Sequence, residues 1–258
     1  MPNTAIVTGA SSGIGAEIAR VHARKGGDLV IAARREASLI SLKEELENEH
    51  GVSVHVVAAD LGTQAGAEKF IADVDALGLE ITILVNNAGL GGHGTILERD
   101  AAADRAMIEL NVQSLVALTH HFGAQMAERG QGRILNVGST AGFIPGPGQA
   151  TYFATKAFVN SFSQAVDHEL RPKGVTSTVL APGYVETEFA KVADLEGTGL
   201  ANQKGATAAS VAKIGYEAMR RGELVIVNEK MLGFMLNWIT PLLPRRWTMN
   251  MIAKMQSK

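Results

Sequence analysis

The chain has 258 residues, of which 46% are hydrophobic and 19% charged, enough for a large core and for an apolar contact between copies, so we expect a homodimer or homotetramer. The net charge of −2 and the scattered arginine pairs at 34–35, 220–221 and 245–246 argue against a nucleic-acid partner. The absence of cysteine excludes a disulfide framework, a thiol nucleophile and a thiolate zinc site, and it favours a reducing compartment, the cytoplasm.

Short runs rich in β-branched residues alternate along the chain with longer segments of helical spacing. The first run begins within about three residues of the N-terminus, without the basic and long apolar regions of a secretion signal, so no signal peptide is expected. Several runs are apolar throughout, a pattern typical of a parallel sheet covered on both faces. The predicted strands are residues 4–8, 29–33, 52–58, 81–85, 132–137, 175–180 and 223–227.

No linker, composition shift or fixed-period repeat divides the chain, so we predict a single domain over residues 1–258. The predicted fold class is α/β, with a doubly wound, seven-stranded, mainly parallel sheet and helices on both faces. Residues 1–230 are assigned to this core, and residues 231–258 to an apolar and basic C-terminal extension.

A glycine-rich turn, Thr-Gly-Ala-Ser-Ser-Gly-Ile-Gly at residues 8–15, joins the first predicted strand to a helical segment. Its glycines permit a tight turn and close approach of a ligand, and the N–H groups at the helix start favour a diphosphate. An ordinary helix start in an α/β protein is the alternative interpretation. The residues assigned to a dinucleotide here are Gly9, Ser11, Ser12, Gly13, Ile14 and Gly15.

The end of the second predicted strand indicates which dinucleotide binds. Proteins that choose NAD usually place a carboxylate there, which binds the ribose 2′-hydroxyl. Here Ala33 takes that position, and Arg34 can pair with a 2′-phosphate through two hydrogen bonds, with Arg35 beside it. The sequence therefore predicts NADP, with NADPH preferred over NADH; the alternative is that both arginines are merely solvated and partly neutralised by Glu36.

Tyr152 and Lys156 are four residues apart in a segment of helical character, so their side chains share one face. A lysine ammonium about 4 Å from a phenol is worth roughly 4 kcal/mol at an effective dielectric constant near 20, which predicts a phenol pKa lowered from about 10 by up to about three units. Tyr152 would then exchange a proton with a carbonyl or alcohol oxygen. Ser139 precedes it and would hydrogen-bond the same oxygen. A tyrosine–lysine pair alone is more often a surface pair.

These motifs together resemble the short-chain dehydrogenase/reductase family, and they follow its order over residues 4–228. The resemblance implies a Rossmann-type fold and an NADP(H)-dependent oxidoreductase that moves a hydride between nicotinamide and a carbonyl or alcohol carbon of a small, largely apolar substrate. It implies that Tyr152 is the general acid or base, that Lys156 also binds the nicotinamide ribose, and that Asn111 holds a water linking Lys156 to solvent. The other cofactor contacts that it implies are Asp60, Leu61, Asn87, Ala88, Gly89, Pro182, Gly183, Val185 and Thr187.

Two further segments are expected beside the substrate. Residues 188–206 form a glycine-containing loop where the family carries a mobile flap, and the mainly apolar residues 143–148 form a wall. We therefore expect a neutral or weakly polar substrate. The histidines show no metal-ligand spacing, since the adjacent His120 and His121 point in different directions on a helix, so no metal is predicted.

The tail from Met231 carries five Met, two Trp and four basic residues, with no acidic ones. Core or subunit packing, a cap over the substrate pocket and contact with a membrane surface are its three interpretations. Its most apolar part, residues 231–243, is shorter than the roughly 20 residues of a membrane-spanning helix.

The rival functions for the chain are a dinucleotide-sensing regulatory protein without turnover, an NAD-dependent dehydrogenase, and an epimerase that uses the same tyrosine and lysine. The lack of a separate sugar-binding domain argues against the epimerase.

Overall fold

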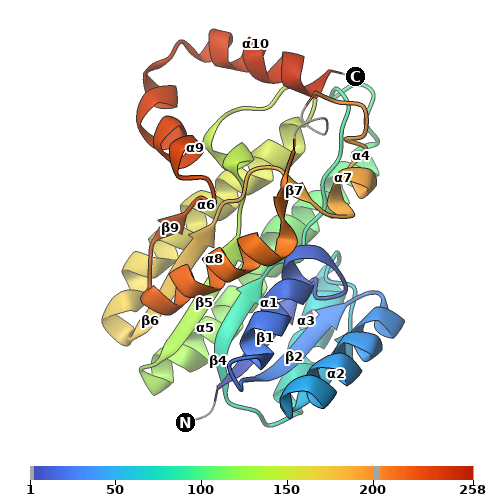
Figure 1. Ribbon diagram of the computed structural model, residues 1–258, viewed down its shortest axis with the longest axis vertical. Helices are drawn as coiled ribbons and strands as arrows, with labels where there is room; N and C mark the ends of the chain where they lie inside the picture. The colour runs from blue at the N-terminus through green and yellow to red at the C-terminus, as the bar shows by residue number, and fades with distance from the viewer. Residues whose placement is uncertain (1–2, 200–203, 258) are drawn as a thin grey trace.

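A seven-stranded parallel sheet forms the centre of the computed structural model, which describes residues 3–199 and 204–257. The strand order is β3-β2-β1-β4-β5-β6-β9, and every neighbouring pair is parallel (Figure 1). The strands are β1 (Thr4–Thr8), β2 (Asp28–Ala33), β3 (Val54–Ala58), β4 (Ile81–Asn86), β5 (Gly132–Val137), β6 (Val175–Leu180) and β9 (Val225–Ile226).

Helices cover both faces of this sheet because successive side chains of a strand point to opposite sides. Ala5 and Val7 of β1 belong to a core shared with α1, α2 and α8, whereas Ile6 belongs to a second core shared with α3, α5 and α6. The prediction of a doubly wound Rossmann-type sheet is therefore confirmed. The covering helices are α1 (Gly13–Ala23), α2 (Glu36–His50), α3 (Gln64–Asp75), α5 (Leu115–Arg129), α6 (Ala150–Leu170) and α8 (Ala208–Arg221).

The strand order reverses between β1 and β4, and the loops that leave these two strands diverge there. In open α/β sheets this switch point forms a crevice beyond the carboxyl ends of the strands. The remaining short elements lie around this end of the sheet or in its connections. They are α4 (Ala101–Ile108), the π-helix Glu109–Ser114, the 3-10 helices Thr140–Phe143 and Arg171–Lys173, and α7 (Phe189–Val192).

The predicted strands differ from the observed ones mainly at their ends. The third begins at Val54, although the carbonyl of Ser53 still accepts a hydrogen bond from Leu29 N, and the last shortens to Val225–Ile226. A second, two-stranded sheet was not predicted: β7 (Val185–Glu186) pairs with β8 (Ala206–Thr207), which takes in the end of the predicted loop 188–206. Residues 200–203 of that loop lie outside the described residues.

The tail folds back as two α-helices joined by a short π-helix and a 3-10 helix. They are α9 (Lys230–Phe234), the π-helix Met235–Ile239, the 3-10 helix Thr240–Leu242 and α10 (Arg245–Gln256). In Figure 1 these red segments arch over the carboxyl-end side of the sheet, opposite the N-terminus. Among the described residues no helix combines the length and the hydropathy needed to cross a bilayer.

Candidate active site

A cavity of about 760 Å³ opens at the carboxyl ends of the strands and extends beneath the tail. Its walls are the loops after β1, β4, β5 and β6 together with one side of α9 and α10. Every site residue predicted from the sequence lines this cavity except Gly15 and Asn111.

The glycine-rich turn lies against the loop after β4. Gly9 and Gly13 have φ angles of +66° and +58°, a conformation that L side chains rarely adopt. A Cβ on Gly9 would stand 2.7 Å from Asn87 Nδ2 and 2.9 Å from Ala88 Cα. Gly15 lies beneath the turn, where a Cβ would collide with Asn87 Nδ2 and Gly9 O, so it permits packing within the turn and does not face the cavity.

Thr8 and Asn87 hold these two loops together. The Thr8 hydroxyl donates to Val85 O at 3.2 Å and accepts from Asn87 N and Ala88 N, both at 3.0 Å. Asn87 Nδ2 reaches back to Thr8 O at 2.9 Å. Asn87 thus fastens the end of β4 to the glycine-rich turn and also lines the cavity, where it is predicted to contact the cofactor.

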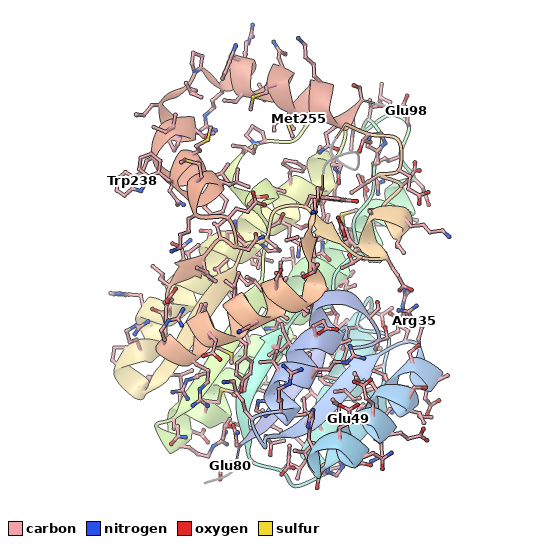
Figure 2. The ribbon with its side chains drawn as sticks, in the orientation of Figure 1. Arg35, Glu49, Glu80, Glu98, Trp238 and Met255 are labelled. Carbon is pink, nitrogen blue, oxygen red and sulfur yellow. The ribbon has the colours of Figure 1, made fainter. Side chains whose placement is uncertain are left out.

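The two arginines after β2 differ in their surroundings. Arg35 Nη2 donates to Ser12 Oγ at 2.9 Å and to Glu188 Oε2 at 2.9 Å, so its guanidinium bridges the glycine-rich turn and the segment after β7. Figure 2 shows Arg35 at the side of the molecule below α7. Arg34 is exposed at the cavity, and within residues 3–199 and 204–257 it has no carboxylate partner. Arg34 is therefore available to an anionic ligand, whereas Arg35 is occupied.

Ser139, Tyr152 and Lys156 meet at the cavity wall beyond β5. Ser139 caps the short helix after β5, and its hydroxyl is a hydrogen-bond partner of the Tyr152 phenol. Tyr152 and Lys156 occupy one face of α6, as their spacing predicts, and Lys156 Nζ lies 5.9 Å from the centre of the Tyr152 ring. Lys156 Nζ donates to Val137 O at 2.8 Å. Three chemically distinct groups thus surround one point of the cavity.

Burial dominates the protonation of this pair. Desolvation raises the pKa of Tyr152 to about 12, against the opposing effect of the Ser139 hydrogen bond, and desolvation lowers the pKa of Lys156 to about 8. The predicted lowering of the Tyr152 pKa by its lysine neighbour is therefore wrong for this arrangement. The reason is that desolvation penalises the ionised phenol, while the Lys156 ammonium donates to Val137 O and lies 5.9 Å from the centre of the ring.

Asn111 lies in the π-helix Glu109–Ser114, where it is 2% exposed. Its Oδ1 accepts from Leu90 N at 2.8 Å, and its Nδ2 donates to Leu90 O at 2.9 Å and to Thr155 Oγ1 at 3.0 Å. The side chain thus fastens the loop after β4 to α6, one residue from Lys156. The structure gives Asn111 a positioning contact; its predicted role in holding a water stays a prediction.

The other predicted cofactor residues also take identifiable positions. Asp60 Oδ1 accepts from Gly62 N at 3.0 Å, a contact within a turn, and Asp60 also lines the cavity. Thr187 lies over the glycine-rich turn, since a Cβ on Gly13 would stand 3.3 Å from its methyl group. Along the same walls lie Ile14, Leu61, Ala88, Gly89, Pro182, Gly183 and Val185.

Sequence reasoning missed several residues of the cavity. The Phe189 ring stands 5.5 Å from the Tyr152 ring, and Gln149 Nε2 donates to Gln256 Oε1 at 2.7 Å. Gln256 belongs to the buried side of α10 with Thr248 and Ile252. Their spacing of four residues is a helical stripe that the sequence displays, so the inward face of this helix could have been found.

Within the part of the chain that the structure describes, no three His, Asp or Glu side chains gather as a metal site would require. His121, from the pair considered above, instead approaches Asp75, with 2.8 Å between Nε2 and Oδ2.

Comparison with known proteins identifies the family. Residues 3–196 match the family described as short chain dehydrogenase, so the chain belongs to the short-chain dehydrogenase family. Over 194 residues it is 37% identical to sulfoacetaldehyde reductase 2 of Chromohalobacter salexigens. The aligned part is 74% of this chain and 76% of that protein.

Two solved structures cover nearly the whole chain. A short-chain dehydrogenase from Sphingobium yanoikuyae, in complex with NADPH, has a TM-score of 0.85 at 31% identity and covers 97% of this chain and 95% of its own. The bulky-bulky ketone specific alcohol dehydrogenase from Comamonas testosteroni has a TM-score of 0.78 at 30% identity, with 96% and 90% covered.

A side chain at position 9 has two effects, a collision with the loop after β4 and backbone strain at positive φ, and these can be measured separately. Gly9→Ala and Gly26→Ala both place a side chain at positive φ, but Gly26 has nothing within 4 Å of the added Cβ. We expect Gly26→Ala to lower the free energy of unfolding by about 1 kcal/mol, and Gly9→Ala by about 1–3 kcal/mol more because Asn87 and Ala88 must move. Urea unfolding measures both, and equal losses would show that the two loops do not touch.

The buried Lys156 should cost stability. Because its pKa falls to about 8 on folding, the unfolded chain binds more protons between about pH 8 and pH 10.5, and stability contributed by this group rises with pH across that window. Lys156→Met removes the cost of burying the ammonium, and the loss of a partner for Val137 O offsets part of this gain, so we expect the free energy of unfolding at pH 7 to rise by about 1–2 kcal/mol. The gain should shrink at pH 10; a Lys156→Met protein less stable at pH 7 contradicts this.

Proposed function

We propose that this protein is an NADP(H)-dependent oxidoreductase that transfers a hydride between nicotinamide and the carbonyl or alcohol carbon of a small, largely apolar substrate. The observation that carries the proposal is the placement of Ser139, Tyr152 and Lys156 on the same cavity as the glycine-rich turn. Membership of the short-chain dehydrogenase family supports the class of reaction.

The cavity fits a dinucleotide at its glycine-rich end. A side chain at Gly9 would fill the space between the turn and Ala88, and the start of the eleven-residue α1 presents N–H groups to a diphosphate. Ala33 brings no carboxylate to the end of β2, and Arg34 is unpaired among the described residues, which favours a 2′-phosphate. The complex of the Sphingobium yanoikuyae protein with NADPH supports the same preference.

A bound nicotinamide would supply or accept the hydride and, when oxidised, would add a positive charge to the site. In the reducing direction Tyr152 donates its hydroxyl proton to the carbonyl oxygen as the carbon receives the hydride. The Ser139 hydroxyl holds that oxygen through a hydrogen bond, and the Lys156 ammonium stabilises the negative charge left on the phenol. In the oxidising direction the proton and the hydride move the opposite way.

The raised pKa of Tyr152 suits it to the acid role that reduction requires. With a pKa of about 12 the phenol keeps its proton at neutral pH, so it is ready to act as an acid. Acting as a base at the same pH requires additional positive charge near the ring, beyond that of Lys156.

The substrate end of the cavity is mainly apolar. Phe153, Phe189 and Leu195 line it from the sheet side, and Leu232, Leu236 and Ile252 line it from the tail. These side chains favour an apolar carbonyl compound, in keeping with the bulky ketones named for the Comamonas testosteroni relative.

The proposed domain organisation rests on the shared cavity, and the proposed location and oligomeric state rest on composition. Residues 1–230 act as the dinucleotide-binding core of a single domain and residues 231–258 as its cap, because both parts line one cavity. The cytoplasmic location and the homodimer or homotetramer stay predictions from composition.

Turnover separates this proposal from a dinucleotide-sensing protein. We expect steady NADPH oxidation with at least one member of a panel of aldehydes, ketones, quinones, steroids and 3-oxoacyl thioesters. Tight NADPH binding without turnover on the whole panel would favour the sensor.

Tyr152→Phe tests the proton-transfer step. Loss of the hydroxyl should lower kcat by about 100-fold or more, while the Kd of NADPH stays nearly unchanged. Tyr184→Phe is a matched control, because Tyr184 lines the same cavity and also loses only a hydroxyl. Stopped-flow kinetics and fluorescence titration measure the two constants, and near-normal kcat in Tyr152→Phe would remove this residue from the mechanism.

Arg34→Ala tests the cofactor preference. If its guanidinium pairs with the 2′-phosphate, the Kd of NADPH should rise by about tenfold or more, and that of NADH by much less. Arg35→Ala in parallel shows whether the bridged arginine contributes as well. Titration with both dinucleotides gives the ratio, and equal losses for NADPH and NADH in Arg34→Ala would reject the assignment.

A further inference from the structure

The tail exposes a continuous stripe of large apolar side chains. Met231, Phe234, Met235, Trp238, Ile239 and Leu242 are between 41% and 82% exposed. Their spacing of three, one, three, one and three residues places them along one side of a helical segment, with Met235 at the edge of that side because it also lines the cavity. Figure 2 shows Trp238 at the outer edge of the tail, pointing away from the body of the protein.

The opposite side of the same segment faces the cavity. Leu232 and Leu236 line the cavity, and Leu236 is 7% exposed. A helix that is apolar on both sides is normally buried on both sides. The inner side of this one is covered by the protein, so its outer side needs a separate partner.

Basic residues flank the stripe. Lys230, Arg245, Arg246 and Lys254 are exposed, and none of them has a carboxylate partner within residues 3–199 and 204–257. Residues 230–258 hold five of the 24 basic residues and none of the 26 acidic ones, so 19 basic residues face 26 acidic ones in the rest of the chain. The tail is thus a cationic, apolar surface on an otherwise acidic protein.

Charge argues against a contact between the tails of two copies. Such a symmetric contact would bring the cations of one tail against those of the other. A two-fold contact that places each tail on the acidic body of the other copy would close a dimer, and the light-scattering experiment below tests it. An anionic apolar surface satisfies both properties of the tail at once.

We propose that the outer side of the tail, residues 230–254, docks on an anionic lipid surface. Trp238 and Trp247, which are 69% and 56% exposed, occupy the interface between lipid headgroups and acyl chains, as tryptophan does at membrane boundaries. Arg245 and Arg246 pair with lipid phosphates, and Leu242 enters the acyl layer. The tail lies on the bilayer without crossing it.

Intrinsic fluorescence reports on this surface without a label, because Trp238 and Trp247 are the two tryptophans of the chain. On addition of phosphatidylglycerol vesicles to the full-length protein, the emission should shift to shorter wavelength, and brominated acyl chains should quench it. Phosphatidylcholine vesicles should give a smaller shift, and salt at about 0.5 M should reverse most of the shift with the anionic vesicles. Unchanged emission with phosphatidylglycerol overturns the proposal.

Vesicle sedimentation measures the contributions separately. Arg245→Gln/Arg246→Gln should weaken partitioning to anionic vesicles by about 30-fold, because each basic residue at such a surface contributes a factor of about five. Trp238→Gln/Leu242→Gln should weaken it by about tenfold or more. Exposed residues just after α1, in the 3-10 helix before β6 and on α2 provide the controls Arg24→Gln/Lys173→Gln and Ile40→Gln, which should bind like the wild type.

Light scattering at the same protein concentration tests the second copy. One outcome is that Trp238→Gln/Leu242→Gln converts a dimer into a monomer and that the wild type stays in the supernatant with both kinds of vesicle. The stripe is then a subunit interface, and the lipid proposal fails. Wild-type binding that both double variants lose, with no change in molar mass, supports it.

Discussion

The buried hydroxyl of Thr8 joins the two loops that form one wall of the cavity. Thr8 is 1% exposed at the carboxyl end of β1, and its side chain bonds to Val85 O, Asn87 N and Ala88 N at the end of β4. These are the two strands between which the sheet order reverses, and they are already paired up to Val7 and Val85. The hydroxyl continues this contact beyond the strand ends, and Gly9 has no Cβ to prevent the glycine-rich turn from approaching Ala88.

Much of the fold was readable in the sequence because its strands are buried on both faces. β1 and β4 are buried at every residue, and in the sequence they appear as mainly apolar, β-branched runs without a polar face, although Thr82 and Asn86 lie within β4. The spacing of Tyr152 and Lys156 placed both on one face of α6 for an equally local reason. Strands of two residues, such as β7 and β8, are too short to show any period.

The rest of the site depended on contacts between distant parts of the chain. Arg34 and Arg35 are neighbours in sequence, and only the position of Glu188, 153 residues from Arg35, makes one occupied and the other available. The pKa of Tyr152 likewise depends on desolvation at its place in the fold and on the direction of Lys156 Nζ, which donates to Val137 O. Neither spacing nor composition carries this information.

The cavity joins two parts of unlike chemistry. Its polar side, with Ser139 and Lys156, lies on the sheet within residues 3–196, the stretch that matches the family. Its apolar side includes Leu232 and Ile252 of the tail, which lies beyond that stretch. Substitutions in the tail can therefore change the shape offered to a substrate while the groups that exchange protons stay in place.

The bridge between Arg35 and Glu188 has its own consequence for working conditions. Both side chains are more than half exposed, so dissolved ions weaken their attraction, whereas the apolar core of the sheet is insensitive to such screening. Raising the ionic strength thus weakens the Arg35–Glu188 ion pair beside the glycine-rich turn and leaves the core of the sheet unchanged. The salt concentration of the solution therefore affects how strongly the segment after β7 is held to Arg35 beside the glycine-rich turn.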